Sequence, residues 1–368
     1  MRLHRTAVFS LGLTFALTPA VQAQAPSAEA PRVTNAKLET RAVSGSLAAE
    51  FRSLVERQAG PAWIGYAVPQ IPGEHSMCCG NYDDSRAGCG ACRLEARDVG
   101  ANTTSGEKQT VKLEGSRNIV VLFRAEKGAV GKIRAFSEDC ALDAGGLPFV
   151  WLTGVNAAES VALLEPFVSR WENDSHDDHE TRHAALMVIA MQDGEASSQA
   201  LERFTAPDRP EKLREQTAFW LGAARGAAGL PLLTRLAKND PSSHVRGHVA
   251  FALSVSKEPG ALDEMIRMAK TDAAGYVRGQ ALFWLAQKAG KRAAGTITAA
   301  IQDDPDTDVK KKAVFALSQL PKDDGVPKLI EVARTNKNPA VRKQAMFWLG
   351  QSRDPRAIDF FAEILTRK

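Results

Sequence analysis

The stretch VRGHVAFAL at residues 245–253 decides the fold, because related stretches recur along the chain at a fixed interval. The copies begin at residues 181, 213, 245, 277, 309 and 341, each 32 residues after the last, with the first copy the weakest. Within a copy, counting its first residue as position 0, apolar residues at positions 4, 7 and 8 form one helical stripe. A turn and a second apolar helix complete each unit. One such hairpin cannot bury its own apolar face, so we predict that six units stack into an α-solenoid over residues 173–368.

Two polar columns follow the same period. Acidic or amide residues lie in successive turns between units, and a basic residue follows each one six positions later. The columns are Asp208, Asp240, Asp272, Asp304 and Asn336, and Arg214, Arg246, Arg278, Lys310 and Arg342. This spacing, together with the pattern Val-Arg-x-x-Ala-x-x-Ala-Leu, resembles HEAT repeats of the short, phycobilisome-lyase type. The resemblance implies a structural role for both columns, bridging turns between repeats, and it transfers no enzymatic activity.

A column of phenylalanines is the candidate binding surface. Position 6 is occupied by Phe219, Phe251, Phe283, Phe315 and Phe347. It lies about 140° from the centre of the apolar stripe, since each residue turns a helix by about 100°. The column therefore predicts an aromatic ladder on an exposed face, suited to a protein or peptide partner. Alternatively, each ring fills the groove between adjacent first helices.

Two further columns flank the phenylalanines. Position 2 is expected to be solvated and holds Glu215, Gly247, Gly279, Lys311 and Lys343. Position 7 is expected in the core, where large and small residues alternate between repeats: Trp220, Ala252, Trp284, Ala316 and Trp348.

The beginning of the chain has the layout of a secretory signal peptide over residues 1–23. Basic Arg2 and Arg5 precede an apolar run at residues 7–20, and Ala23 ends a small-x-small cleavage site. We therefore expect a periplasmic or secreted protein; an uncleaved N-terminal anchor is the alternative. No later stretch of 18 or more apolar residues exists, so no membrane span is expected there.

Between the leader and the solenoid we expect a linker and a small domain. Residues 24–43, rich in Ala, Pro, Ser and Thr, are the predicted linker, and residues 44–172 a small α+β domain of no recognised family. The expected elements are helices at 47–58 and 157–171 and strands at 64–71, 110–114, 118–125 and 129–136.

This domain contains all the cysteines: Cys78, Cys79, Cys89, Cys92 and Cys140. In an oxidising compartment they default to disulfides, although their odd number means that at least one thiol is free, paired with another chain or used otherwise. His75 and Cys78, followed by Cys89 and Cys92, also have acceptable zinc spacing. A redox role for the Cys89-x-x-Cys92 pair is the third alternative.

The sequence His179-Glu180-Thr181-Arg182-His183 matches H-E-x-x-H, in which two histidines bind zinc and the glutamate activates water. In the repeat register His179 aligns with turns before the first helices, so we expect a charged, solvated opening of the solenoid instead. A zinc-dependent hydrolase is the alternative, with Glu195 or Glu202 as a third ligand.

The remaining sequence favours binding over catalysis. A net charge of +4 makes no case for nucleic acid. Walker, G-x-G-x-x-G and G-x-S-x-G motifs are absent from the sequence, and no cofactor is expected. We therefore expect a scaffold that binds a protein or peptide, of undetermined oligomeric state.

Overall fold

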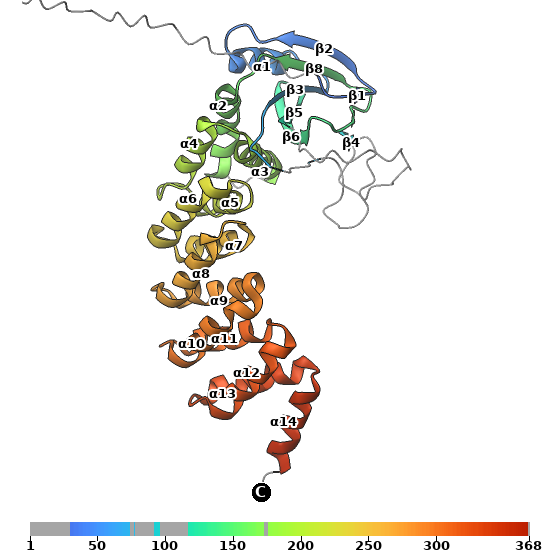
Figure 1. The fold of residues 1–368 in the computed structure, drawn as a ribbon. Helices are drawn as coiled ribbons and strands as arrows, with labels where there is room; N and C mark the ends of the chain where they lie inside the picture. Colours follow the sequence, from blue (N-terminus) through green and yellow to red (C-terminus); the bar gives the residue numbers. More distant parts are fainter. Residues whose placement is uncertain (1–29, 74–76, 78–91, 96–116, 173–175, 367–368) are drawn as a thin grey trace, which may run out of the picture.

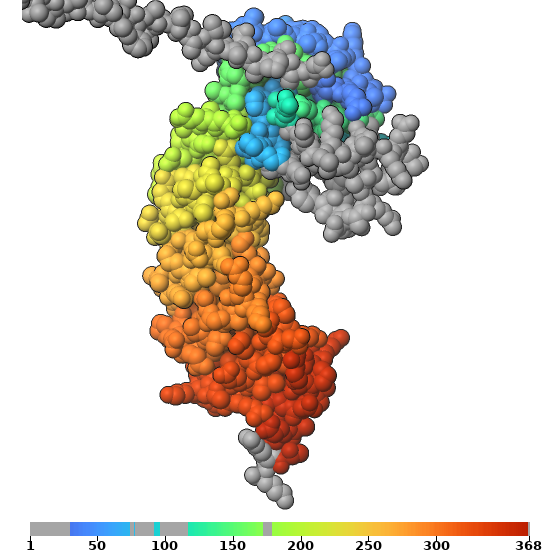
Figure 2. All heavy atoms as spheres, viewed as in Figure 1, coloured from blue at the N-terminus to red at the C-terminus, as the bar shows by residue number. Residues whose placement is uncertain are grey.

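A small α+β module leads into a long, curved column of helix pairs (Figure 1), as the sequence predicts. The computed structural model describes residues 30–73, 77, 92–95, 117–172 and 176–366. Figure 2 shows that the described part forms an elongated body that bends along its length. Among the described residues, no helix combines the length and apolar character needed to cross a bilayer.

The module is built on a five-stranded sheet in the order β2-β8-β3-β5-β6. Its strands are β2 (Lys37–Ala42), β3 (Ala62–Pro69), β5 (Asn118–Glu126), β6 (Ala129–Ser137) and β8 (Pro148–Thr153). β3, β5 and β6 pair antiparallel, whereas β8 runs parallel to both β2 and β3. Helices α1 (Leu47–Glu56) and α2 (Ala157–Val168) share an apolar core with one face, and a 3-10 turn (Ser169–Glu172) follows α2.

A second apolar cluster lies on the other side of this sheet. It contains Trp63, Leu122 and Trp151, all almost fully buried. A small three-stranded sheet contributes to it, in the order β1 (Val33–Thr34), β7 (Leu142–Asp143) and β4 (Cys92–Arg93). The module is therefore a sheet with apolar packing on both faces.

Five strands of the module, β1, β2, β4, β7 and β8, were not predicted from the sequence. The predicted linker at 24–43 contains β2, which pairs residue by residue with β8, from Lys37 opposite Pro148 to Ala42 opposite Thr153. β2 lies at the edge of the sheet and is mostly exposed, so its pairing needs no buried apolar face that the sequence would reveal. β8 was missed as well, and the strand expected at 110–114 lies outside the described residues.

Six helix pairs form the solenoid, one for each predicted unit. The first helices are α3 (His176–Met191), α5 (Glu211–Ala223), α7 (Ser243–Val255), α9 (Gly275–Ala289), α11 (Thr307–Ser318) and α13 (Pro339–Ser352). The second helices are α4 (Glu195–Phe204), α6 (Gly226–Asn239), α8 (Gly260–Thr271), α10 (Ala294–Asp303), preceded by a 3-10 turn (Gly290–Ala293), α12 (Lys322–Thr335) and α14 (Pro355–Thr366). The apolar stripe is buried as expected; Val245, Val249 and Leu253 have no exposed surface.

The module and the solenoid share one continuous core. The same buried cluster extends from Phe51 in α1 to Phe360 in α14. At the junction, the Ile71 amide donates to the Met191 carbonyl and the Asp193 amide to the Pro69 carbonyl, both at 2.9 Å. The sheet therefore caps the first unit, which a solenoid needs at its open end.

Candidate binding surface on the first helices

Buried ion pairs fix how successive units stack. Nε and Nη2 of Arg246 donate to the two carboxylate oxygens of Asp272, at 2.8 and 3.0 Å, while Nη1 donates to the Asp240 carbonyl at 2.8 Å. Arg278 makes the equivalent bonds with Asp304 and the Asp272 carbonyl. Each arginine thus joins the turn before its own helix to the turn of the next unit, which holds the first helices at a fixed spacing.

The columns change at both ends of the array. Asp208 is exposed and forms no ion pair with any described residue. Lys310 donates to the Gln302 carbonyl at 2.7 Å, and Arg342 donates only to backbone carbonyls, among them that of Asn336 at 2.8 Å. The bidentate pairs therefore join the middle units, where Arg214 also binds Asp240.

The phenylalanines and tryptophans form one unbroken row of ring contacts from α5 to α13. Phe219 stacks on Phe251, with centroids 5.8 Å apart and planes at 14°, and Phe283 stacks on Phe315 at 5.6 Å and 5°. Trp284 bridges these two stacks, 4.6 Å from Phe251 and 4.9 Å from Phe283. We call this row the aromatic ladder: Trp220, Phe219, Phe251, Trp284, Phe283, Phe315, Trp348 and Phe347.

The ladder lies partly in the grooves between helices and partly at the surface. The first four phenylalanines are half-buried, and Phe347 is 54% exposed. The tryptophans are also half-buried, whereas core positions were expected for them. Trp284 and Trp348 instead contact Phe251 and Phe315 of the preceding units. The residue after each of these phenylalanines is a fully buried alanine, Ala252 or Ala316.

Position 2, expected to be solvated, is covered in the middle of the array. Gly247 and Gly279 are buried. A Cβ on Gly247 would collide with the Tyr276 ring, and one on Gly279 with the Lys312 stem. Side chains of the following first helix therefore lie across these glycines. Glu215 is buried too, which leaves Lys311 and Lys343 as the accessible members.

The ladder opens into a cleft between α11 and α13. This cleft has a volume of about 470 Å³ and is lined by Asp308, Lys311, Lys312, Phe315, Gln344 and Trp348. Phe315 and Trp348 contact each other at 4.8 Å and form its aromatic wall. Cationic and amide side chains surround that wall, so the cleft combines an apolar surface with hydrogen-bond donors.

The H-E-x-x-H segment lies inside a helix, contrary to the expectation from the repeat register. α3 begins at His176, so the His179 and His183 rings lie one turn apart with centroids at 4.2 Å. The His183 ring also contacts Trp171 at 4.6 Å. Burial, reinforced by His179 and Arg182, lowers the pKa of His183 to about 4, so its imidazole is neutral at pH 7.

A third ligand for these histidines is missing from the part of the chain that the structure describes. Glu202 is engaged by Arg235 at 2.6 Å, and Glu195 accepts a hydrogen bond from Gln199 at 2.8 Å. No group of three or more His, Cys, Asp or Glu side chains able to hold a metal converges among the described residues. The helix thus supplies a pair of nitrogen donors and no complete site.

The cysteines are only partly described. Cys92 and Cys140 are 1% and 2% exposed in the second apolar cluster of the module. Cys78, Cys79 and Cys89 lie outside the described residues, as does His75.

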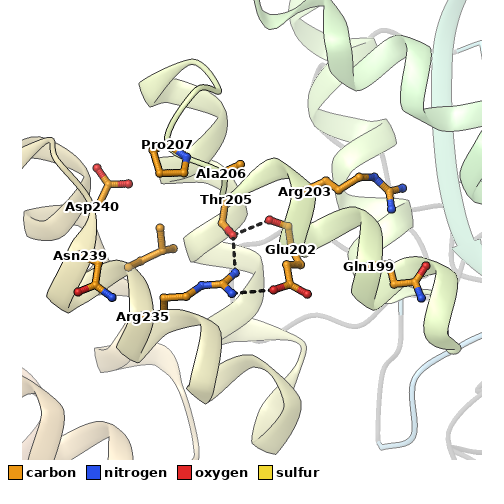
Figure 3. A pocket seen from close by; sticks show the side chains of 10 residues that line it. Gln199, Glu202, Arg203, Thr205, Ala206, Pro207, Arg235, Asn239 and Asp240 are labelled. Carbon is orange, nitrogen blue, oxygen red and sulfur yellow. Dashed lines mark hydrogen bonds and ion pairs between the residues drawn. The ribbon is translucent and has the colours of Figure 1, made fainter.

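A larger cavity, which the sequence did not predict, lies on the second-helix side between α4 and α6 (Figure 3). Its volume is about 610 Å³, and Glu202 and Arg235 meet across it (Figure 3). Arg235 also donates to the Thr205 hydroxyl at 3.5 Å. These charged groups thus already have partners in each other.

Comparisons with known proteins support the repeat assignment. A family model described as HEAT repeats matches residues 203–286 and 295–368, and the solenoid is made of HEAT-like repeats. No curated protein matches the chain.

Three solved structures illustrate the similarity in fold. Human deoxyhypusine hydroxylase is 17% identical with a TM-score of 0.30, covering 57% of this chain and 80% of its own. The complex of CpcE and CpcF of phycocyanin lyase from Nostoc sp. PCC7120 is 18% identical with a TM-score of 0.26, covering 51% and 98%. A designed armadillo repeat protein in complex with a (KR)4 peptide is 16% identical with a TM-score of 0.26, covering 52% and 82%.

Proposed function

We propose that this protein is an exported binding protein of the cell envelope, and that its solenoid holds an extended segment of a protein partner along the aromatic ladder. The observation that carries the proposal is the unbroken row of rings from Phe219 to Phe347 on one side of the array. Half-buried aromatic side chains offer large, rigid contact areas at low entropic cost, and they are enriched in interfaces. Phe347 leaves more than half of its surface available.

Capture of partners from envelope extracts tests this proposal if a variant of the aromatic ladder is compared with the wild type. The full chain, a Phe315→Ser/Phe347→Ser variant and an Ile358→Ser control are compared as baits, since Ile358 is a highly exposed apolar residue on a second helix. We expect a partner that the wild type and the control retain and the ladder variant loses, and that binds again as a purified protein. Equal capture by all three baits would refute the assignment of the site.

Export and disulfide stapling are part of the same proposal. Residues 1–23 support export through their basic start and apolar run. The burial of Cys92 and Cys140 in one apolar cluster supports a structural role for these cysteines. N-terminal sequencing of the secreted protein should start after Ala23. Thiol titration should find four oxidised cysteines and one free thiol; five reactive thiols in the native protein would contradict stapling.

Zinc binding by His179 and His183 remains the second candidate, because the two rings share one face of α3 and His183 is neutral at pH 7. Hydrolysis would need Glu180 and a third ligand from outside the described residues. Elemental analysis decides between the readings. One equivalent of zinc that disappears in His183→Gln supports a metal site, and a metal-free protein refutes it.

A further inference from the structure

Charge is distributed unevenly along the first helices. α5 has two acidic residues, Glu211 and Glu215, and two basic ones, Lys212 and Arg214. α11 instead has three lysines and one aspartate, and α13 has one arginine, one lysine and no acidic residue. The cleft between α11 and α13 therefore lies at the basic end of the ladder.

The lysines around this cleft differ in how far they are already used. Lys311 pairs with Asp308 at 2.9 Å. The Lys312 ammonium lies over the Tyr276 ring at 5.5 Å and forms no ion pair with a described carboxylate, although its charge, after the hydrogen bond and charge of Lys311, lowers the pKa of Asp308. Lys343 is exposed and forms no ion pair with a described residue. Lys312 thus lines the cleft together with Phe315 and Trp348, and Lys343 lies on α13 next in sequence to the lining residue Gln344.

Resting on the proposed function, we propose that this cleft binds an acidic, extended segment of the protein partner. Apolar or proline side chains of the segment pack on Phe315 and Trp348, and its carboxylates pair with Lys312 and Lys343. Charge complementarity determines the occupant, because a basic segment would leave these lysines facing like charges. Asp308, already paired with Lys311, offers a basic segment little compensation.

The geometry of an extended peptide suits this spacing. Neighbouring packed helices lie about 8–10 Å apart. A polyproline II segment advances about 9 Å in each three-residue turn. A glutamate at every third residue of such a segment would therefore present about one carboxylate to each unit that it crosses, including the units that contain Lys312 and Lys343.

Three twelve-residue peptides with blocked ends test the proposal: four repeats of Pro-Pro-Glu, of Pro-Pro-Gln and of Pro-Pro-Lys. Their affinities for the full chain are measured by calorimetry, with quenching of tryptophan fluorescence as a second readout. Two exposed ion pairs should make the glutamate peptide bind about fivefold tighter than the glutamine peptide. This advantage should shrink as the salt concentration rises from about 50 to about 300 mM, because dissolved ions screen exposed ion pairs. The lysine peptide should bind weakest.

Matched variants locate the preference. Lys312→Gln/Lys343→Gln should bind the glutamate and glutamine peptides equally. Lys238→Gln/Lys270→Gln removes the same charge from exposed positions on second helices and should leave the preference intact. Unfolding curves of both variants that overlay the wild type confirm that the fold is kept.

These experiments test separately whether the bound segment is acidic and whether the aromatic ladder binds a peptide at all. If the wild type binds the glutamate and glutamine peptides equally and Phe315→Ser/Phe347→Ser weakens both, the acidic occupant is wrong while the ladder remains a peptide site. If no peptide binds, the proposed acidic occupant is likewise refuted, and the capture experiment tests independently whether the aromatic ladder binds a protein partner.

Discussion

Removing one buried ion pair between successive units, that of Arg278 and Asp304, should show how much these pairs contribute to the stability of the solenoid. In Arg278→Met the Asp304 carboxylate, whose side chain is 6% exposed, loses hydrogen bonds at 2.7 and 2.9 Å. The Asp272 carbonyl loses its 2.9 Å bond from Nη1 as well. Asp304 keeps only the bond from the Asp306 amide, at 2.9 Å. Since a buried charge without its partner is destabilising by about 3–5 kcal/mol, we expect a loss of that order in the free energy of unfolding.

The loss should depend on pH in a defined direction. In the wild type, burial opposes ionisation of Asp304, but the hydrogen bonds from Arg278 outweigh it and hold the carboxyl pKa below its ordinary value. The pair therefore contributes stability above the unfolded pKa of about 3.9, and this contribution is lost as pH falls through the lower folded pKa. Without Arg278 the unpaired carboxylate becomes neutral at low pH. The deficit of Arg278→Met should thus be largest near neutral pH and shrink as the pH is lowered toward about 3.

Urea titrations followed by helical circular dichroism, repeated across this pH range, measure the effect. The double variant Arg278→Met/Asp304→Leu removes both charges and should recover much of the lost stability, because apolar replacements of buried pairs are often neutral. A deficit below about 1 kcal/mol at neutral pH would refute the reasoning. So would a double variant no more stable than the single one.

Three further outcomes follow from packing and burial. Gly222→Ala should destabilise the protein by about 1–3 kcal/mol, because its Cβ would collide with a backbone carbonyl of the next first helix. Gly350→Ala, at the same repeat position but in open space, should stabilise it by up to about 1 kcal/mol in the same urea titration. In an NMR titration the His183 ring should protonate near pH 4, and a midpoint near 6.5 would contradict its burial. As the pH falls from about 6.5, the unfolded pKa, to about 4, the wild type should lose stability, and His183→Gln should lose less over the same range. Phe283→Ala should cost about 1–2 kcal/mol through its stacked, half-buried ring, and Phe347→Ala clearly less, so similar midpoint shifts would contradict the difference in burial.

The repeat was predictable because similar residues recur at the same positions every 32 residues. Val245 and its equivalents mark each unit, and the 32-residue interval alone gave the helix pairs now observed. What the sequence could not give depends on neighbours. Trp284 is partly covered by Phe251 one unit earlier, and Gly247 is covered by Tyr276 one unit later. Such contacts join residues about one repeat apart, and the repeat pattern does not predict which side chains of neighbouring units contact each other.

The H-E-x-x-H segment was misplaced for a different reason. α3 starts five residues before its position 0 at Thr181, whereas α7 starts two residues before Val245. The equivalent stretch contains a proline in four of the other five units, such as Pro241, and a glycine, Gly275, in the fifth; both residue types disfavour an extension of the helix toward its N-terminus. Residues 177–180 contain no proline and are rich in acidic residues, which favour a helix N-terminus, so the helix begins earlier and encloses both histidines.

Packing accounts for much of the ladder, so the charges beside it carry the sharper functional argument. Trp284 and Trp348 pack on Phe251 and Phe315 of the preceding units, and these contacts stabilise the array whether or not a partner binds. Phe347 lies on α13, and among the described residues no further first helix packs against α13 to cover it. Neither argument applies to Lys343, which is exposed, forms no ion pair with a described residue and directly precedes Gln344, a residue that lines the cleft. A charge preference that disappears with Lys312 and Lys343 would thus distinguish a binding surface from a row of rings that only packs.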